Sequence, residues 1–246
     1  MRFAAIADIH GNKLALEAVI ADIGSMGIRD IVNLGDHLSG PLVPPGTADV
    51  LMESQILSIQ GDQDRILVDL SHSSPALSDR NDFKQLSRRH FDWLASLPST
   101  MLYRDEVFLC HGTPKDDATH WLEVVSDAGR LQKRPIEQVA SYATGVKASL
   151  LLCGHTHLPE IACLPSGQIV VNVGSVGCPG YEVKKPVAYK VEAGTPHACY
   201  AIFEKTRQNW TVTFRYVPYD HAAMAKMAEA NGLRAWASAL RTGRIS

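Results

Sequence analysis

The chain has 246 residues, enough for one large or two small domains with a sizeable hydrophobic core. A hydrophobic fraction of 46% and a charged fraction of 20% are typical of an ordinary soluble globular protein, and a net charge of -2 gives no electrostatic reason to expect nucleic acid or an acidic membrane as a partner. No apolar run approaches the ~18 residues that a membrane-spanning helix needs. The five Cys residues form no C-x-x-C pair, which favours reduced thiols and a cytoplasmic location.

In chain order, the first part of the sequence is predicted to alternate strands and helices. Apolar runs of strand length lie at residues 3–7, 31–34 and 56–60. A helical spacing of apolar residues over 13–23 separates the first two runs, and a second helix is expected at 47–54. Because two strands joined by a helix form a βαβ unit, we expect a largely parallel sheet here.

The middle of the chain is predicted to contain a third helix and then a second sheet. The helix would begin at Asp79 or Asn81, either of which could cap it, and would end before Pro98. From residue 101 the pattern changes to short strands separated by turns, which indicates a mixed or antiparallel sheet. These strands are expected at 101–103, 107–110, 150–153, 160–164, 168–173, 199–204 and 210–217.

Two further segments complete the organisation, which we interpret as a single domain over residues 1–246. Residues 113–147 are polar and mostly irregular, with one helix expected at 135–143. Residues 219–241 are Ala-rich and broken by Gly232, so they predict one or two C-terminal helices.

Five of the predicted strands end abruptly in polar residues that carry chemistry. In open α/β sheets, ligands bind beyond the carboxyl ends of the strands, so we expect these side chains to share one site. The strand ends read Asp8-Ile9-His10, Gly35-Asp36, Gly61-Asp62-Gln63-Asp64, His111-Gly112 and Gly154-His155-Thr156-His157.

Carboxylates and imidazoles in this pattern favour a pair of divalent metal ions. Asp8 and His10 lie two residues apart, so in extended backbone their side chains point the same way. A mixed carboxylate and imidazole set suits Mn²⁺, Fe²⁺ or Zn²⁺, and one carboxylate, here that of Asp36, can bridge two ions. Two ions about 3.5–4 Å apart can hold a hydroxide that attacks phosphorus, because they lower the pKa of bound water. The remaining imidazoles are those of His111, His155 and His157.

These strings resemble the motifs of the calcineurin-like metallophosphoesterases. Residues 172–177 are similar to the N-P-G-S turn of that family, and residues 217–220 are similar to its small bacterial and archaeal phosphodiesterase-like branch. The resemblance implies an α/β fold, a four-layer sandwich of two mixed β-sheets flanked by helices, that hydrolyses phosphomonoesters or phosphodiesters. By motif position it implies one metal ion held by Asp8, His10, Asp36 and His157, and a second held by Asp36, Asp62, His111 and His155.

The third strand end departs from the family pattern, which usually reads G-N-H-D or G-N-H-E. Asp62 stands where the family has a neutral Asn ligand, so with Asp8, Asp36 and a hydroxide it would neutralise both ions and weaken their pull on a phosphate. Gln63 stands where the family has a His that is implied to stabilise the transition state or to protonate the leaving oxygen. Gln63 can donate a hydrogen bond but no proton. Losing a general acid typically lowers the reaction rate by ~10²–10⁴-fold, and the rate falls least for a substrate with a good leaving group.

Several residues near the motifs could contribute to the site or have only a structural role. Asn12 could bind a substrate phosphate or only cap the helix that begins at residue 13. His37 could replace the missing proton donor if it faces the site, or it could be an exposed loop His. Asp64 is expected to support a neighbouring loop. The stretch 113–147, with His120, could form a substrate-specificity loop or lid over the site, or only a solvated connection.

The sequence therefore predicts a hydrolase of phosphodiesters or phosphoanhydrides that uses two divalent ions, Mn²⁺ before Fe²⁺, Zn²⁺, Ni²⁺ or Mg²⁺. The expected substrate is a small phosphorylated molecule such as a nucleotide diester or a dinucleoside polyphosphate. One alternative is a protein or general phosphomonoester phosphatase. The other is a catalytically weak metal-binding scaffold, which should expose an apolar patch. The sequence leaves open whether the chain forms a homo-oligomer.

Overall fold

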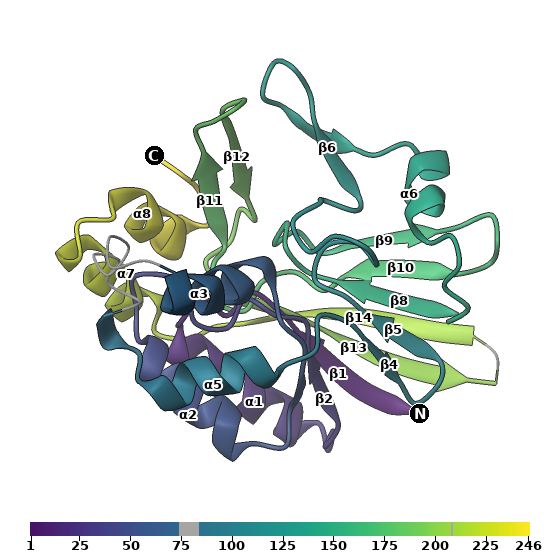
Figure 1. The fold of residues 1–246 in the computed structure, drawn as a ribbon, viewed down its shortest axis with the longest axis horizontal. Coiled ribbons are helices and arrows are strands. Elements are labelled where there is room, and N and C mark those ends of the chain that lie inside the picture. Colours follow the sequence, from purple (N-terminus) through teal and green to yellow (C-terminus); the bar gives the residue numbers. More distant parts are fainter. Residues whose placement is uncertain (74–83, 208) are drawn as a thin grey trace.

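The computed structural model describes residues 1–73, 84–207 and 209–246, which form two five-stranded sheets flanked by helices (Figure 1). Both sheets are mixed, so the predicted α/β class and the sandwich of two mixed sheets are confirmed. The predicted helix start at Asp79 or Asn81 lies outside the described residues. Within the described residues, no helix is long and apolar enough to cross a membrane.

The first sheet contains the three parallel strands that the sequence predicted and two strands from the end of the chain. Its order is β14-β13-β1-β2-β3, with β1 at Arg2–Ile6, β2 at Ile31–Asn33, β3 at Leu57–Ser58, β13 at Ala198–Thr206 and β14 at Asn209–Val217. β13 pairs antiparallel with β1, and β14 with β13. The prediction that residues 199–204 and 210–217 belong to the second sheet is therefore wrong.

The second sheet is built from the remaining predicted strands. Its order is β4-β5-β8-β10-β9, with β4 at Met101–Tyr103, β5 at Val107–Leu109, β8 at Leu150–Cys153, β9 at Glu160–Cys163 and β10 at Ile169–Asn172. The central strands β5, β8 and β10 run parallel, and the edge strands β4 and β9 are antiparallel to their neighbours.

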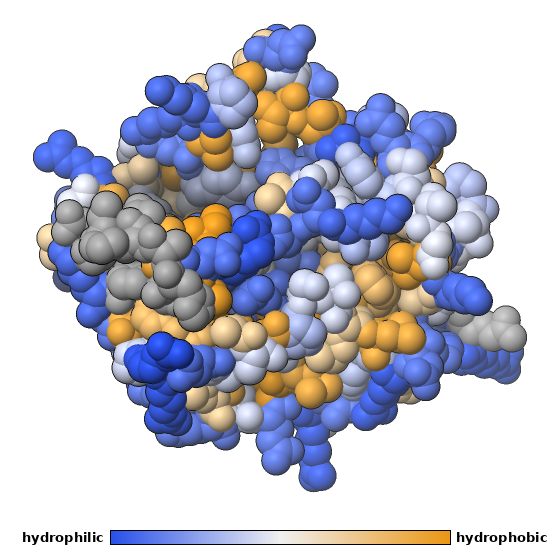
Figure 2. Space-filling view, viewed as in Figure 1, coloured by the Kyte–Doolittle hydropathy of each residue, from blue (hydrophilic) through white to orange (hydrophobic). Residues whose placement is uncertain are grey.

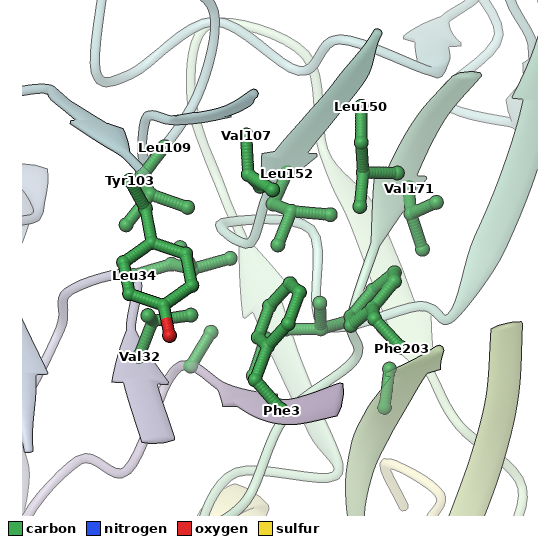
Figure 3. Close-up of a cluster of buried hydrophobic side chains, with 14 of the residues drawn as sticks. Phe3, Val32, Leu34, Tyr103, Val107, Leu109, Leu150, Leu152, Val171 and Phe203 are labelled. Atoms are coloured by element: carbon green, nitrogen blue, oxygen red, sulfur yellow. The ribbon is translucent and has the colours of Figure 1, made fainter. Parts of the chain in front are cut away.

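The two sheets pack face to face through apolar side chains that alternate along each strand. Phe3 of β1 lies in the core between the sheets, where its ring stacks on Phe203 with centroids 5.1 Å apart (Figure 3). Leu150 and Leu152 of β8 enter the same core from the second sheet. Ile6 of β1 belongs instead to a second cluster on the outer face of the first sheet.

Helices cover the outer faces of the sheets, as Figure 1 shows. The helix α1 buries Leu16, Val19 and Ile23 against the first sheet, and α6 buries Val139 against the second. The helices are α1 at Lys13–Ser25, α2 at Pro44–Glu53, α3 at Asp62–Ser73, α5 at Arg88–Ser96, α6 at Ile136–Tyr142, α7 at His221–Ala230 and α8 at Arg234–Thr242.

Two helices and two hairpins differ from the sequence prediction. The helix α2 begins at Pro44, earlier than predicted, because proline fits the first turn of a helix. The helix α3 follows β3 directly and was not predicted. Two hairpins were also missed, β6–β7 (Glu123–Val125 and Leu131–Lys133) and β11–β12 (Gly180–Val183 and Tyr189–Glu192). In Figure 1 the hairpins that contain β6 and β11 rise on the same side of the sheets.

The core between the sheets predicts a large difference between two Leu→Ala substitutions. Leu150 is fully buried in β8, whereas Leu102 of β4 is 52% exposed. Leu150→Ala should lower the free energy of unfolding by ~2–5 kcal/mol through lost burial and a cavity, and Leu102→Ala by less than ~0.5 kcal/mol. Urea unfolding of both variants measures the difference, and equal losses would contradict the assignment of Leu150 to the core.

Candidate metal centre

The candidate ligands lie where the parallel strands of both sheets end. The strands β1, β2 and β3 lead into Asp8, Asp36 and Asp62, and β5 and β8 lead into His111 and His155. The backbone N–H of His155 donates to the carboxylate of Asp8 over 3.1 Å, which joins the ends of the two sheets. The strand ends that the sequence singled out therefore share one place in the fold.

Most of these residues sit on backbone that L-amino acids rarely adopt. Positive φ angles are found at Asp8 (55°), His10 (50°), Asp36 (56°), His155 (69°) and His157 (62°). Such conformations cost ~1–3 kcal/mol each and persist only where the surrounding structure holds them. Their concentration at five candidate ligands is typical of a functional site.

The first cluster comprises Asp8, His10, His157 and the Oδ2 atom of Asp36. The Nε2 atom of His10 lies 3.1 Å from Nε2 of His157 and 3.6 Å from Oδ2 of Asp36. The Nε2 atom of His157 lies 3.3 Å from Oδ1 of Asp8. All four residues are buried.

The second cluster comprises Asp62, His111, His155 and the Oδ1 atom of Asp36. Oδ1 of Asp62 lies 3.1 Å from Nε2 of His111 and 3.0 Å from Nδ1 of His155. Nε2 of His111 lies 3.4 Å from Oδ1 of Asp36. The carboxylate of Asp36 therefore presents one oxygen to each cluster, as a group that bridges two ions must.

Hydrogen bonds on the far side of the imidazoles fix which nitrogen faces the clusters. Nδ1 of His111 and Nδ1 of His157 each lie 2.7 Å from a backbone carbonyl oxygen, to which they donate. Nδ1 of His10 lies 2.8 Å from the hydroxyl of Ser39. The Nε2 atoms of His111 and His157 therefore face the clusters, whereas His155 presents Nδ1.

The carboxylates and imidazoles shift one another's pKa values in opposite directions. Burial alone would raise the pKa of Asp8, but the neighbouring imidazoles hold it below its usual value. The pKa of Asp62 is likewise held well below its usual range by hydrogen bonds from His111, against the effect of burial. Burial would lower the pKa values of His111 and His157, but the carboxylates raise both well above their usual value. Protons on the imidazoles thus balance the buried negative charge when no metal ion does.

The donor set fits divalent metal ions. Among the described residues, no Lys or Arg forms an ion pair with Asp8, Asp36 or Asp62, although these three residues are at most 5% exposed. The Oδ1 atom of Asp8 is buried without a hydrogen-bond partner. Buried carboxylates need compensating charge, and the imidazole nitrogens facing them are ordinary ligands of divalent ions. We therefore regard the two clusters as a candidate pair of metal sites.

Asp64 holds the loop that carries Asp36. Its carboxylate accepts the backbone N–H groups of Asp36, His37 and Gly61 over 2.8, 2.9 and 3.0 Å, and the ring of His37 over 2.6 Å. This is the supporting role expected from the sequence. His37 is fully buried and its ring packs on Trp93 at 5.2 Å, so the exposed-loop reading is wrong. Its side chain faces Asp64 and does not line the pocket described below.

Asn12 uses its whole side-chain amide within the protein. Its Oδ1 atom accepts the N–H of Ala15 and caps α1, and its Nδ2 atom donates to the carbonyl of Gly177 and the hydroxyl of Tyr219, each over 3.0 Å. The residue is fully buried. These contacts favour the capping role over contact with a substrate.

Gln63 lies at the start of α3 beside both clusters. Its backbone N–H donates to Oδ1 of Asp36 over 2.9 Å, and its Nε2 atom donates to Oδ2 of Asp62 over 2.8 Å. The side chain also lines the pocket over the site. Gln63 therefore orients two of the candidate ligands as well as facing the space for a substrate.

A pocket of about 670 Å³ lies over the two clusters, within the range of small-molecule sites. Ala118 and His120, from the stretch 113–147, line it, and the ring of His120 lies 5.1 Å from that of His155. The sequence did not predict the other walls of the pocket. Only the alternation of residues in 180–183 and 189–192 indicates a hairpin there, and nothing in the sequence indicates that this hairpin faces the site. The further lining residues include Cys178, Tyr181, Val183, Tyr189, Leu233 and Trp236. The thiol of Cys178 lies within 4.8 Å of the ligand nitrogens of His10 and His157.

Comparison with known proteins gives the same assignment as the motifs. The model of the calcineurin-like phosphoesterase superfamily domain matches residues 1–193. The chain belongs to this superfamily. A metallophosphoesterase from Sphaerobacter thermophilus has 26% identity and a TM-score of 0.74, over 99% of this chain and 100% of that one.

Other similar proteins come from archaea. The chain is 25% identical to MJ0912 of Methanocaldococcus jannaschii, over 95% of this chain and 94% of that protein. The structure of PH1004 from Pyrococcus horikoshii has 18% identity and a TM-score of 0.73, and the shared fold covers 100% of this chain and 99% of that one. The phosphoesterase fold thus extends over the C-terminal helices, beyond the residues that the superfamily model matches.

Because Gly61 packs tightly against Asp36, a larger residue at position 61 is predicted to weaken metal binding. A Cβ atom at Gly61 would come within 2.5 Å of the backbone nitrogen of Asp36 and would overlap its carboxylate, whereas one at Gly24 in α1 would meet nothing within 4 Å. Gly61→Ala should therefore lower the number of Mn²⁺ ions retained per chain after dialysis. Gly24→Ala should retain them and gain ~0.5–1 kcal/mol of stability. Atomic absorption and urea unfolding measure both, and full retention by Gly61→Ala would contradict the role given to Asp36.

Glu123 in β6 predicts a pH-dependent stability. Burial raises the pKa of its carboxyl to about 7, against a lowering by a hydrogen bond with Thr156. Because the folded-state pKa exceeds the unfolded value, the protonated carboxyl supports the fold below about pH 4.5, and this support is lost as the pH rises toward 7. In metal-free protein, Glu123→Gln should match wild type at pH 4.5 and exceed it by up to ~3 kcal/mol at pH 8 in urea unfolding. Glu17→Gln, on the exposed face of α1, should show no such difference; a flat Glu123→Gln profile would contradict the assignment.

Proposed function

We propose that this chain is a phosphoesterase that binds two divalent metal ions and hydrolyses phosphodiesters or phosphoanhydrides. The observation that carries the proposal is the carboxylate of Asp36, whose two oxygens face two clusters of Asp and His side chains under a pocket of small-molecule size. Membership of the calcineurin-like superfamily supports phosphoester chemistry at this site. When bound, the two ions would polarise the phosphoryl oxygens and acidify an attacking water.

The donor set also suggests which metals the site takes. Four imidazoles and three carboxylates suit borderline divalent ions, so we expect Mn²⁺ first, with Fe²⁺, Zn²⁺, Ni²⁺ or Mg²⁺ as alternatives. Asp8, His10 and His157 would hold one ion, and Asp62, His111 and His155 the other. Asp36 would serve both, and the backbone N–H of Gln63 keeps its shared carboxylate in place.

Gln63 sets the preference for the leaving group. Its amide donates to Oδ2 of Asp62 and holds no proton that it could transfer. His37, which the sequence suggested as a substitute proton donor, is bound to Asp64 away from the pocket. The leaving oxygen must therefore depart without protonation from either residue, which favours aryl esters and anhydrides over alkyl monoesters.

The distribution of exposed apolar residues argues against the scaffold reading. The large exposed hydrophobic residues of the described chain lie on the four edge strands of the sheets and at the pocket rim: Leu57, Leu102, Ile161, Tyr216 and Leu233. Figure 2 shows orange and blue residues intermixed over the face that it presents. The buried Asp and His side chains lie under a pocket of small-molecule size, as an enzyme requires, and the pocket walls favour a small substrate over a phosphoprotein.

Turnover of two chromogenic esters tests the proposal. Metal-stripped protein reloaded with Mn²⁺ should hydrolyse bis-p-nitrophenyl phosphate faster than p-nitrophenyl phosphate. Loss of a group that only orients a metal ligand already lowers activity by ~10–100-fold, so His155→Ala should lower the turnover by at least that factor. Leu102→Ala, exposed and remote from the ligands, is the control and should keep full activity. No turnover of either ester by protein that holds two ions per chain would refute the proposal.

The third strand end predicts a change in leaving-group dependence. Gln63→His should speed hydrolysis of aryl phosphodiesters with poor leaving groups by up to ~10²-fold and change good ones little, because a general acid matters most for a basic leaving oxygen. The measurement is kcat/KM over a series of phenols of graded pKa, with Gln63→Ala as the matched control. An equal gain on every ester would count against a missing proton donor.

A further inference from the structure

The pocket over the two clusters has aromatic walls that come from three separate parts of the chain. Trp236 lies on α8, Tyr181 and Tyr189 lie on the β11–β12 hairpin, and His120 comes from the stretch 113–147. The hydroxyl of Tyr189 lies 3.4 Å from Nε2 of His120, which joins two of these walls. The rim carries Leu233, which is 43% exposed.

These rings contact the imidazoles of the candidate metal centre directly. The ring of Trp236 lies 5.8 Å from that of His10, and the ring of Tyr181 lies 4.8 Å from that of His157, both edge to face. The aromatic surface therefore begins where the clusters end. A group esterified to a phosphate held at the clusters would lie against these rings.

The pocket offers little to a polyanion. Among the described residues that line it, none is Lys or Arg. Arg65 of α3 lies near Asp62, but its guanidinium forms a two-pronged ion pair with Asp117 over 2.7 and 2.9 Å. Recognition of additional phosphates normally uses Arg or Lys side chains. A substrate with several phosphates would find no such partner in these walls.

We propose that the substrate is a singly charged phosphodiester with at least one flat aromatic ring, which lies against Trp236 and Tyr181. This assignment rests on the proposed function and narrows its substrate class. A nucleobase and a simple aryl group share the required chemistry, because either offers a flat face to stack and an edge for a T-shaped contact. A dinucleoside polyphosphate fits the walls less well than a diester.

Equilibrium binding tests the assignment without turnover. Mn²⁺-loaded protein is titrated by calorimetry with diphenylphosphinate and with dicyclohexylphosphinate, two monoanions whose P–C bonds cannot be hydrolysed and whose rings differ in flatness. Diphenylphosphinate should bind ~5–10-fold more tightly. Equal affinities would overturn the proposal, since apolar burial alone would then explain binding.

Two variants at one position separate stacking from folding defects. Trp236→Phe keeps a flat ring and should keep most of the preference, whereas Trp236→Leu, of similar volume to Phe, should bring the two affinities within about twofold. Thermal unfolding of both variants shows whether they are equally folded. If both variants keep the preference for the flat ligand, the ring of the ligand does not lie against Trp236, and the assignment to Trp236 is overturned.

Further ligands distinguish the source of the ring and test the charge argument. Tighter binding of adenosine 5′-methyl phosphate than of phenyl methyl phosphate would identify a nucleoside diester, and the reverse a simple aryl diester; either supports the proposal. Diadenosine tetraphosphate should bind no more tightly than the adenosine diester, and a tenfold gain would overturn the single-charge requirement. Aromatic preference without any turnover would refute the proposed function alone, because binding is measured independently.

Discussion

Three carboxylates buried side by side at the meeting point of two sheets are the constraint on which the rest of this structure depends. Asp8, Asp36 and Asp62 are at most 5% exposed, and among the described residues imidazoles are the only basic side chains that form ion pairs with them. Burying such charges without partners costs several kcal/mol each. The raised pKa values of His111 and His157 show how the metal-free protein meets this demand, with protons where divalent ions would otherwise supply the charge.

The surrounding backbone is organised to hold that arrangement. The strand-end turns place non-glycine residues at positive φ, a conformation that the neighbouring chain must enforce. Asp64 enforces it at Asp36 by accepting N–H groups from both loops that meet there, and Gly61 allows these loops to approach closely. Strain at the site is therefore offset by a hydrogen-bonded carboxylate that faces neither the pocket nor a metal position.

The sequence predicted the strand ends because parallel strands put their carboxyl ends at one edge, so Asp8, Asp36 and Asp62 had to meet. Local patterns also predicted α1, although α2 begins at Pro44, three residues before the predicted start at residue 47. The assignment of β13 and β14 to the wrong sheet has a different origin, since the pairing of Phe3 with Phe203 joins residues far apart in sequence. The pocket walls formed by the β11–β12 hairpin and α8 were missed for the same reason, because nothing near Trp236 in the sequence relates it to His10.

The departures at the third strand end and the composition of the pocket walls have one common consequence. If the centre binds the two divalent ions proposed above, three carboxylates and an anionic nucleophile would leave no net positive charge there, so attraction for a doubly charged monoester would be weaker than at a site with a neutral ligand in place of Asp62. The walls do not restore that charge, since Arg65 is paired with Asp117. Binding must then come from the apolar and aromatic surface of Tyr181 and Trp236 more than from charge. A singly charged diester loses the least binding free energy at such a centre. A substrate with a good leaving group loses the least in rate when residue 63 is a glutamine.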